Sequence, residues 1–533
     1  MLYFLAGLLI TLAVYLPTAV ASFIRHDDYC YFFAVASKTC HGMNIYSAYV
    51  DQGRLLLAEL QWCTLPALFM HSPDMRFFVL LRLGNLLVIA AAFGMFASWL
   101  AQRTSLGKSG SIFLSTLIFT LPGYHFWAAQ ALSAANAFAL LFALAASLLV
   151  CEAPRPFTMK SPDFLLKNIL AAEFLLLTLF TYQPHALMFF LPAAALLFFA
   201  SRERWPDTAG RIGWHLLLFL FSLALYLLLQ KKLVFPFYHK LFPAVVDLGQ
   251  KRLEFSLDLS GLWKNLLGNL ANPKAYNLWF LENSPTIANF FKLFLGGSLL
   301  AAGVTQLINA SKGDRPENDR KELLQRIGLG LALWIAAQWP QILLGKFDFY
   351  RVTVHLSSFL VFGFIWSIGF WCRLSPNLFG KKNIRTALLA VFAVCAALLA
   401  RHNAYKDFAL ISRSEFDYLK KELAPLLEKK AGSAFIIRPF YTVRDADDEH
   451  TAYTSFFENN YGLKGMIKRI WLEEGKNFED LDIINFPQRV MWVKDRAAIW
   501  GAAHRQLRID LNRLYQLHAR EYPPTRAGSA VPK

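Results

Sequence analysis

The sequence predicts a polytopic α-helical membrane protein whose helices are followed by a small soluble α/β domain. Of its 533 residues, 56% are hydrophobic and only 17% are charged, and the mean hydropathy is +0.36. A soluble globular protein of this length carries more charge and shorter apolar runs. The 48 Phe and 14 Trp residues suit helices in lipid with aromatic side chains at their ends.

Several apolar runs are long enough to cross the hydrocarbon core, and they predict about 11 transmembrane helices. The runs lie near residues 2–22, 77–100, 111–124, 127–150, 165–181, 184–200, 212–230, 287–308, 326–344, 352–372 and 384–400. The pairs around 111–150 and 165–200 are expected to form tight hairpins, each broken at a Pro in "LPGYHFW" or "TYQPHAL". The first run has no Lys or Arg before it, so we expect an uncleaved helix rather than a signal peptide.

Lys and Arg residues are distributed unevenly over the loops, and this bias predicts the orientation of the chain. The loops at residues 101–110, 151–168, 201–211, 310–326 and 372–385 hold 17 Lys and Arg residues in total. The short turns on the opposite side, "LPGYHFW" and "TYQPH", have none. Positively charged short loops stay in the cytoplasm. Residues 23–75, residues 231–286 and the chain from residue 401 are therefore expected outside it.

Residues 401–533 differ from the preceding part because they are charged and less apolar. A helical pattern in "SRSEFDYLKKELAPLLEKKAG" ends at Gly432, and a strand-like "SAFIIRPF" and a further helix follow. We therefore expect two parts. The first is a transmembrane module over residues 1–400 with outer loops 23–75 and 231–286, and the second is an extracytoplasmic α/β domain over residues 401–533.

The charge and cysteine patterns exclude some classes of function. The formal charge of +17 does not indicate nucleic acid, because the basic residues lie in short loops rather than in one stripe. No Walker loop, GxGxxG, HExxH or GxSxG motif occurs in a supporting context, so an activity driven by a cytoplasmic nucleotide is not indicated. Cys30 and Cys40 share the first outer loop and either form a disulfide or pack as free thiols.

Two adjacent carboxylates, Asp27 and Asp28, follow the first apolar run in "IRHDDYCYFF". Acids this close to a bilayer cost free energy unless they are solvated or paired. One interpretation is that one of them caps a helix through "YCYFFAVASK". The other is that one carboxylate is a general base facing a cavity at the outer leaflet, while its neighbour orients it, binds a sugar hydroxyl or holds a divalent ion.

Two further outer segments place polar side chains near this end. Residues 55–70 are apolar but short and contain Glu59, which predicts an interfacial or re-entrant helix. Arg54, at its start, either binds an anion or pairs with Asp51 or Glu59. In "TYQPHAL", Tyr182 and Gln183 lie at the outer end of a hairpin, where Gln183 either bonds to a sugar hydroxyl or packs between helices.

The late segment "GKFDFYRVTVHLSSF" gathers polar residues at a helix entrance, namely Lys346, Asp348, Tyr350, Arg351 and His355. An ammonium beside a planar guanidinium suits a lipid phosphate, although basic residues also mark membrane interfaces. Acids and bases on the outer face, without a nucleotide motif, favour group transfer from a lipid-phosphate donor. The alternative is a transporter or flippase of lipid-linked glycans that uses the acids for proton coupling.

These motifs resemble those of a known family. "RHDDYCYF", "QGRLLLAEL", "TYQPHAL" and "FYRVTVHLSSF", in this order over most of residues 1–400, resemble the GT-C superfamily of membrane glycosyltransferases. The resemblance is closest to the bacterial serotype-converting O-antigen glucosyltransferases. The layout of about eleven spans with an outer C-terminal domain is also similar.

The resemblance implies an inverting transfer of a sugar from a polyprenyl-phosphate donor to a glycan or lipid-linked glycan, as in the O-antigen of lipopolysaccharide. It also implies a place in the bacterial inner membrane, among membrane lipids, with the active site and the C-terminal domain in the periplasm. Asp27 and Asp28 match the acidic motif, one of them as catalytic base. Arg54 and Arg351 match the early and late basic residues. The other candidate substrate-binding residues are Glu59, Tyr182, Gln183, Lys346, Tyr350 and His355. Some relatives need a divalent cation and others do not, so Mg²⁺ or Mn²⁺ stays open.

Overall fold

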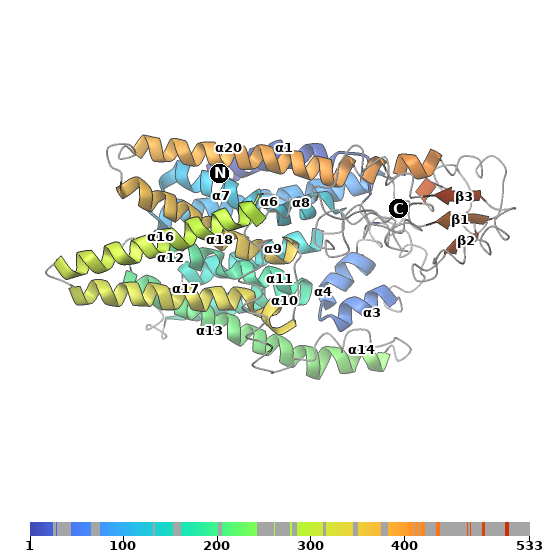
Figure 1. Ribbon diagram of the computed structural model, residues 1–533. Coiled ribbons are helices and arrows are strands. Elements are labelled where there is room, and N and C mark those ends of the chain that lie inside the picture. Colours follow the sequence, from blue (N-terminus) through green and yellow to red (C-terminus); the bar gives the residue numbers. More distant parts are fainter. Residues whose placement is uncertain are drawn as a thin grey trace.

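The chain forms a bundle of long helices with short elements gathered at one end (Figure 1). The computed structural model describes residues 1–24, 28, 44–64, 75–131, 134–152, 161–200, 205–241, 261, 278–279, 285–312, 316–344, 350–374, 382–410, 412–414, 416–421, 433–437, 466, 469–470, 482–485 and 507–510. Predictions that fall on other residues, including those for Asp27 and Lys346, lie outside this part of the chain.

Almost all of the described chain is helical. The α-helices are α1 Leu2–Ala19, α3 Asn44–Asp51, α4 Leu55–Ala58, α6 Met75–Arg103, α7 Gly107–Phe119, α8 Pro122–Ala129, α9 Ala134–Glu152, α10 Pro162–Thr181, α11 Gln183–Ala186, α12 Leu191–Phe199, α13 Trp205–Leu229, α14 Phe235–Leu241, α16 Pro285–Lys312, α17 Pro316–Leu344, α18 Tyr350–Leu374 and α20 Lys382–Ala404. The π-helical turns are Glu59–Thr64, Gln230–Val234 and Tyr405–Leu410, and Leu187–Phe190 is a 3₁₀ turn.

Within the described ranges, eight helices are long and apolar enough to cross a membrane, or nine if α7 and α8 form one broken span. This supports the predicted class but not the count of about eleven. The segment Gln183–Phe199 is shorter than a span because Pro184 and Pro192 interrupt regular α-helix there. Helix α17 is long but is not one of the eight.

One of the two Pro-containing segments differs from the expected tight hairpin turn. Residues 121–127 do not form a turn between two spans, because Pro122 starts α8, which is bent by 70° relative to α7. At "TYQPH", α10 ends at Thr181, Tyr182 is extended, and Pro184 lies in the first turn of α11. Pro lacks the N–H that a continuous helix needs, which explains both breaks.

The short elements mark one end of the bundle. In Figure 1, α3, α4, α11 and the three strands lie toward one end, whereas α16 ends and α17 begins at the other. We call the first the site end and the second the opposite end. The helix ends that flank the five basic loops, for example the end of α9 and the start of α13, meet at the opposite end, where Arg211 donates a hydrogen bond to the Cys151 carbonyl.

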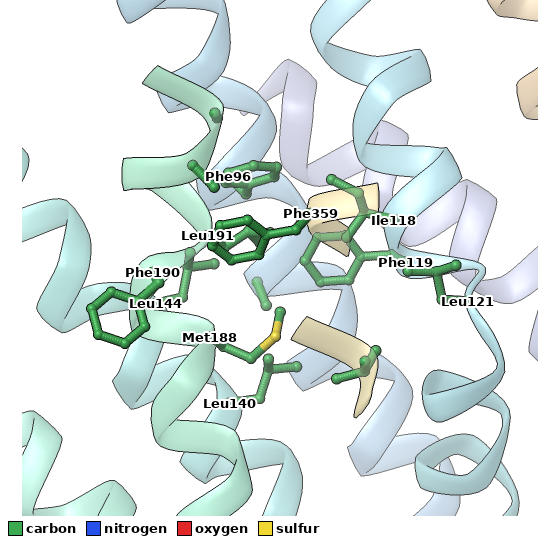
Figure 2. Packing of buried hydrophobic residues seen from close by; sticks show 14 of the residues in the cluster. Phe96, Ile118, Phe119, Leu121, Leu140, Leu144, Met188, Phe190, Leu191 and Phe359 are labelled. Atoms are coloured by element: carbon green, nitrogen blue, oxygen red, sulfur yellow. The ribbon is translucent and has the colours of Figure 1, made fainter. Parts of the chain in front are cut away.

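The core is a continuous apolar cluster in which several helices meet. Figure 2 shows Phe96 of α6, Phe119 of α7 and Phe359 of α18 gathered around Leu191 and Met188. The Phe96 and Phe119 ring centroids are 6.5 Å apart. Many further apolar side chains on the outer faces of the helices are exposed, as expected for helices that contact lipid.

Small residues bring α1 and α6 into close contact. A Cβ added at Gly94 would lie 2.8 Å from the Phe4 Cα, and one added at Gly7 would lie 2.8 Å from the Phe93 Cδ1. Glycine is common where two membrane helices approach this closely, because their backbones then come into contact. The first helix is thereby locked against the core helix that carries part of the candidate site.

After the bundle the structure describes few residues. α20 continues past the expected boundary at residue 400 to Ala404, and the turn Tyr405–Leu410 packs on the site end through Phe408 and Ala409, against Phe23 and Ala129. Three strands follow in the order β2-β1-β3, all parallel: β1 Ser433–Ile437, β2 Asp482–Asn485 and β3 Leu507–Asp510. In register, Ser433 pairs with Asp482 and Ala434 with Leu507. An α/β domain over residues 401–533 stays a prediction.

Candidate functional site

Asp28 is held at the site end by the backbone that follows α8. Its side chain is buried, and its Oδ2 accepts a hydrogen bond of 3.0 Å from the Ala131 N–H. This N–H is available because α8 ends at Ala129 and Gln130 is extended. Asn85 of α6 fixes that helix end, since its Nδ2 donates to the carbonyls of Trp127 (3.0 Å) and Gln130 (2.9 Å). Two helices therefore determine where the carboxylate lies.

Arg82 is a second charged residue of the site, and the sequence analysis missed it. Its side chain on α6 is 1% exposed. It donates to the Ala21 and Phe78 carbonyls, at 3.1 and 3.2 Å, and its guanidinium lies 4.2 Å from the Phe23 ring centroid. The available signal was an arginine inside the apolar run 77–100, because an ionisable residue in a membrane segment indicates function.

The charges of this group interact across the fold. Arg82 lies within electrostatic range of Asp28 and also of Arg469, from the segment after the bundle. Arg469 is buried and lies 3.9 Å from the Phe416 ring centroid. Among the described residues, the Arg82 Nη1 has no hydrogen-bond partner. Two buried guanidinium groups near one described carboxylate form a setting that an anionic group, such as a phosphate, would stabilise.

The motif around Arg54 is fastened to α10, α11 and α13. The Arg54 Nε donates to the Gln183 Oε1 at 3.2 Å, and its guanidinium lies 4.7 Å from the Tyr182 ring centroid. The Gln183 Nε2 donates to the Gln52 carbonyl and to the Tyr226 hydroxyl, both at 2.8 Å. Arg54 and Gln183, predicted from separate motifs, are therefore in direct contact. The alternative pairing of Arg54 with Asp51 or Glu59 stays a prediction.

Glu59 contacts an aromatic pair. Its Oε1 accepts a hydrogen bond of 2.5 Å from the Tyr46 hydroxyl, and the Tyr46 ring stacks on Tyr238 with centroids 5.8 Å apart. Burial raises the pKa of the Tyr46 hydroxyl well above its ordinary value, and the hydrogen bond and negative charge of Glu59 raise it further. Glu59 thus joins α3 to the π-helical turn that it begins.

An aromatic chain connects the Asp28 group with the Arg54 group. His185 is buried, and its ring lies 4.3 Å from Trp127 and 4.6 Å from Tyr182 between centroids. Trp127 belongs to the helix end that positions the Ala131 N–H, and Tyr182 lies under Arg54. The structure therefore brings Asp28 and the "QGR" and "TYQPH" motifs into one continuous region at the site end.

The late cluster is described only in part. Lys346 and Asp348 lie outside the described residues, and Tyr350 and Arg351 are described only as the first backbone positions of α18. Helix α18 packs against α8 and α11, which brings this element to the same region. The His355 side chain is buried, with its Nε2 2.5 Å from the Ala337 carbonyl of α17. This contact indicates helix packing, and its predicted role in substrate binding stays a prediction.

The metal and disulfide predictions have different outcomes. No group of three or more His, Cys, Asp or Glu side chains that could hold a metal ion lies in the described ranges. Asp27 and His26 fall outside them, so Mg²⁺ or Mn²⁺ at the acidic motif stays a prediction. Cys30 and Cys40 also fall outside. Cys63, which the sequence analysis did not single out, forms a disulfide.

No protein-family model matches this sequence, and no curated protein matches it. The site must therefore be interpreted from its chemistry. Chemically, Asp28 can hold a hydroxyl or an orienting group, and Arg82 and Arg54 offer guanidinium donors for a phosphate. The aromatic side chains of Tyr182, Trp127 and Tyr226 are buried and pack this region together.

Proposed function

We propose that this protein is a membrane glycosyltransferase that moves a sugar from a polyprenyl-phosphate donor to a glycan or lipid-linked glycan of the O-antigen type. The observation that carries the proposal is the buried Asp28–Arg82 group, with Arg469 in range, beside the contact between Arg54 and Gln183. It supplies carboxylate and guanidinium groups together at one end of a bundle of apolar helices. A lipid-phosphate donor needs both.

The contacts of Asp28 indicate which role Asp27 and Asp28 each have in the proposed reaction. The Ala131 N–H and the nearby Arg82 charge stabilise the Asp28 carboxylate and hold it in place. A carboxylate that is fixed in this way can orient the acceptor or the neighbouring Asp27 side chain. In our proposal Asp27 is therefore the general base and Asp28 the positioning residue.

In the proposed reaction, an acceptor hydroxyl attacks the anomeric carbon of the donor sugar and Asp27 takes the hydroxyl proton. The bond between the sugar and the phosphate oxygen breaks, and polyprenyl phosphate leaves with the bonding electrons. Attack from the side opposite the phosphate inverts the configuration. Arg82, Arg54, Lys346 and, by resemblance, Arg351 stabilise the charge that grows on the leaving phosphate.

We further propose that the site end and an α/β domain over residues 401–533 lie in the periplasm of a bacterial inner membrane. The disulfide at Cys63 supports this side, because structural disulfides persist in oxidising compartments. The Lys and Arg residues of the short loops gather at the opposite end, which supports a cytoplasmic position for that end.

The test is reconstitution of the purified protein in vesicles with polyprenyl-phosphate sugars and a glycan acceptor. Asp27→Asn should remove nearly all product, and Asp28→Asn should lower the rate by about 100-fold or more. Asp163→Asn is the control, since this acid is an exposed partner of Lys167 in a surface ion pair. Translocation of a lipid-linked glycan without any glycosyl product would support the flippase alternative and overturn the proposal.

A further inference from the structure

A second cavity lies at the opposite end of the bundle, away from the proposed catalytic region. It has a volume of about 400 Å³, and its walls come from α6, α9, α12 and α13. The residues that matter here are Trp99, Arg103, Cys151, Asp207, Thr208 and Arg211. They lie in the last turns of α6 and α9 and in the first turns of α13, which are the ends of three candidate membrane spans.

The cavity is polar and its charge is unbalanced. Arg103 and Arg211 give two positive charges against one negative charge from Asp207. Arg211 is fixed on the wall because it donates to the Cys151 carbonyl. Arg103 is exposed and has no acidic partner among the residues that the structure describes. The walls therefore present guanidinium groups from two different helices to one space.

A buried donor in the same wall lacks an acceptor. Trp99 is 4% exposed, and within the described part of the chain its indole Nε1–H has no hydrogen-bond partner. A buried N–H without an acceptor is costly, so native structures rarely leave one. An oxygen-rich ligand in the cavity would supply the missing acceptor while its negative charge meets the two arginines.

Helix capping explains a neighbouring arginine but not Arg103 or the Trp99 N–H. Arg326 donates to the Leu197 carbonyl at 2.8 Å, pairs with Glu322 at 2.9 Å and stacks 4.0 Å from the Trp205 ring centroid. These contacts explain Arg326 as a residue that caps the C-terminal end of α12. Arg103 and the Trp99 N–H have no such contacts with described residues, and the side chains of both residues line the cavity.

We propose that this cavity binds the phosphate of an anionic membrane phospholipid headgroup. The lining residues lie at the ends of candidate spans, which is the depth of lipid phosphates, and basic pockets between membrane helices bind such headgroups. The next turns of α13 border an apolar cavity of about 340 Å³ lined by Ile169, Trp214, Leu217 and Phe221, among others. This groove suits an acyl chain that runs along α13 from the headgroup.

The test uses the full-length protein in nanodiscs of phosphatidylcholine, with phosphatidylglycerol or inorganic phosphate as the added probe. We expect saturable binding of phosphatidylglycerol, and about tenfold weaker binding for Arg103→Gln and for Trp99→Phe. Neither change removes a contact that the described fold depends on. The matched control is Lys108→Gln, an exposed basic residue of the same loop region that does not line the cavity.

Each outcome decides between sources of the phosphate. Binding of phosphatidylglycerol but not of inorganic phosphate, lost in the two cavity variants and kept in Lys108→Gln, supports the proposal. Equal binding of inorganic phosphate would identify a soluble phosphate compound as the ligand and overturn the lipid assignment. An equal loss in Arg103→Gln and Lys108→Gln, with no loss in Trp99→Phe, would show surface charge alone and would also overturn it. None of these outcomes depends on sugar transfer at the other end.

Discussion

Two constraints require glycine at position 53, namely its backbone angle and the nearby Tyr226 hydroxyl. Its φ is +78°, a region that favours glycine, and an added Cβ would overlap the Tyr226 hydroxyl. We expect Gly53→Ala to destabilise the protein by about 1–3 kcal/mol, measured by thermal unfolding in detergent. Adding Tyr226→Phe should recover only part of this loss, because the backbone strain remains. Full stability of Gly53→Ala alone would contradict the described geometry.

The Tyr46–Glu59 hydrogen bond gives a pH-dependent prediction. The pKa of Tyr46 is raised in the folded state, so its contribution to stability is fully present below the unfolded-state pKa of about 10 and is lost only as pH rises further. Tyr46→Phe should cost about 1.5–3 kcal/mol at pH 7, as for hydrogen bonds to charged groups. Unfolding measured from pH 7 to pH 11 should show a constant difference between the two proteins up to about pH 10. A difference that disappears near neutral pH would contradict the assignment.

Several site residues could be predicted from local sequence, and others could not. Arg54 and Gln183 were both predicted, but their contact joins residues 129 positions apart, which no local pattern reveals. Arg82 and Asn85 were missed because they lie inside an apolar run whose overall hydropathy predicts only a membrane span. The Ala131 N–H has no sequence signal at all, since it depends on where α8 ends.

At the scale of the elements, the contact of α1 with α6 depends on Gly94. Gly94→Ala should destabilise the protein by about 1–3 kcal/mol, because the new methyl group meets the Phe4 backbone. Gly84→Ala on the same helix is the matched control. Nothing lies within 4 Å of its added Cβ, so its stability should be unchanged or raised by up to about 1 kcal/mol. Equal effects in the two variants, by thermal unfolding, would show that the close approach of α1 is not important.

The apolar runs predicted the helices well because burial in lipid or in the core requires long apolar stretches. They predicted the breaks less well. Pro122 was interpreted as part of a turn, but it starts α8, because proline fits the first turn of a helix. A local pattern cannot tell whether a chain turns back after such a break or bends and continues, since packing against neighbouring helices decides it.

For the whole molecule, the proposed function requires the site end and the C-terminal segment to lie on one side of the membrane. Arg469 and the turn Tyr405–Leu410 both lie at the site end, although the sequence alone left the role of residues after 400 open. Alkaline phosphatase fused after Lys533 should be active in cells, because this enzyme needs an oxidising compartment. Cys63 should react with a maleimide only after reduction. An inactive fusion, with Cys63 reactive at once, would reverse the orientation.

The most direct test of the central claim is a double-mutant cycle on sugar transfer from a polyprenyl-phosphate donor. The variants are Asp28→Asn, Arg82→Lys and both together, with Arg413→Gln as an exposed control. If Asp28 and Arg82 act as one unit, each single change should lower the rate by about 100-fold or more, and the double change should add little beyond them. Wild-type rates in both single variants, or a double variant whose loss is the full product of the two, would contradict the claim.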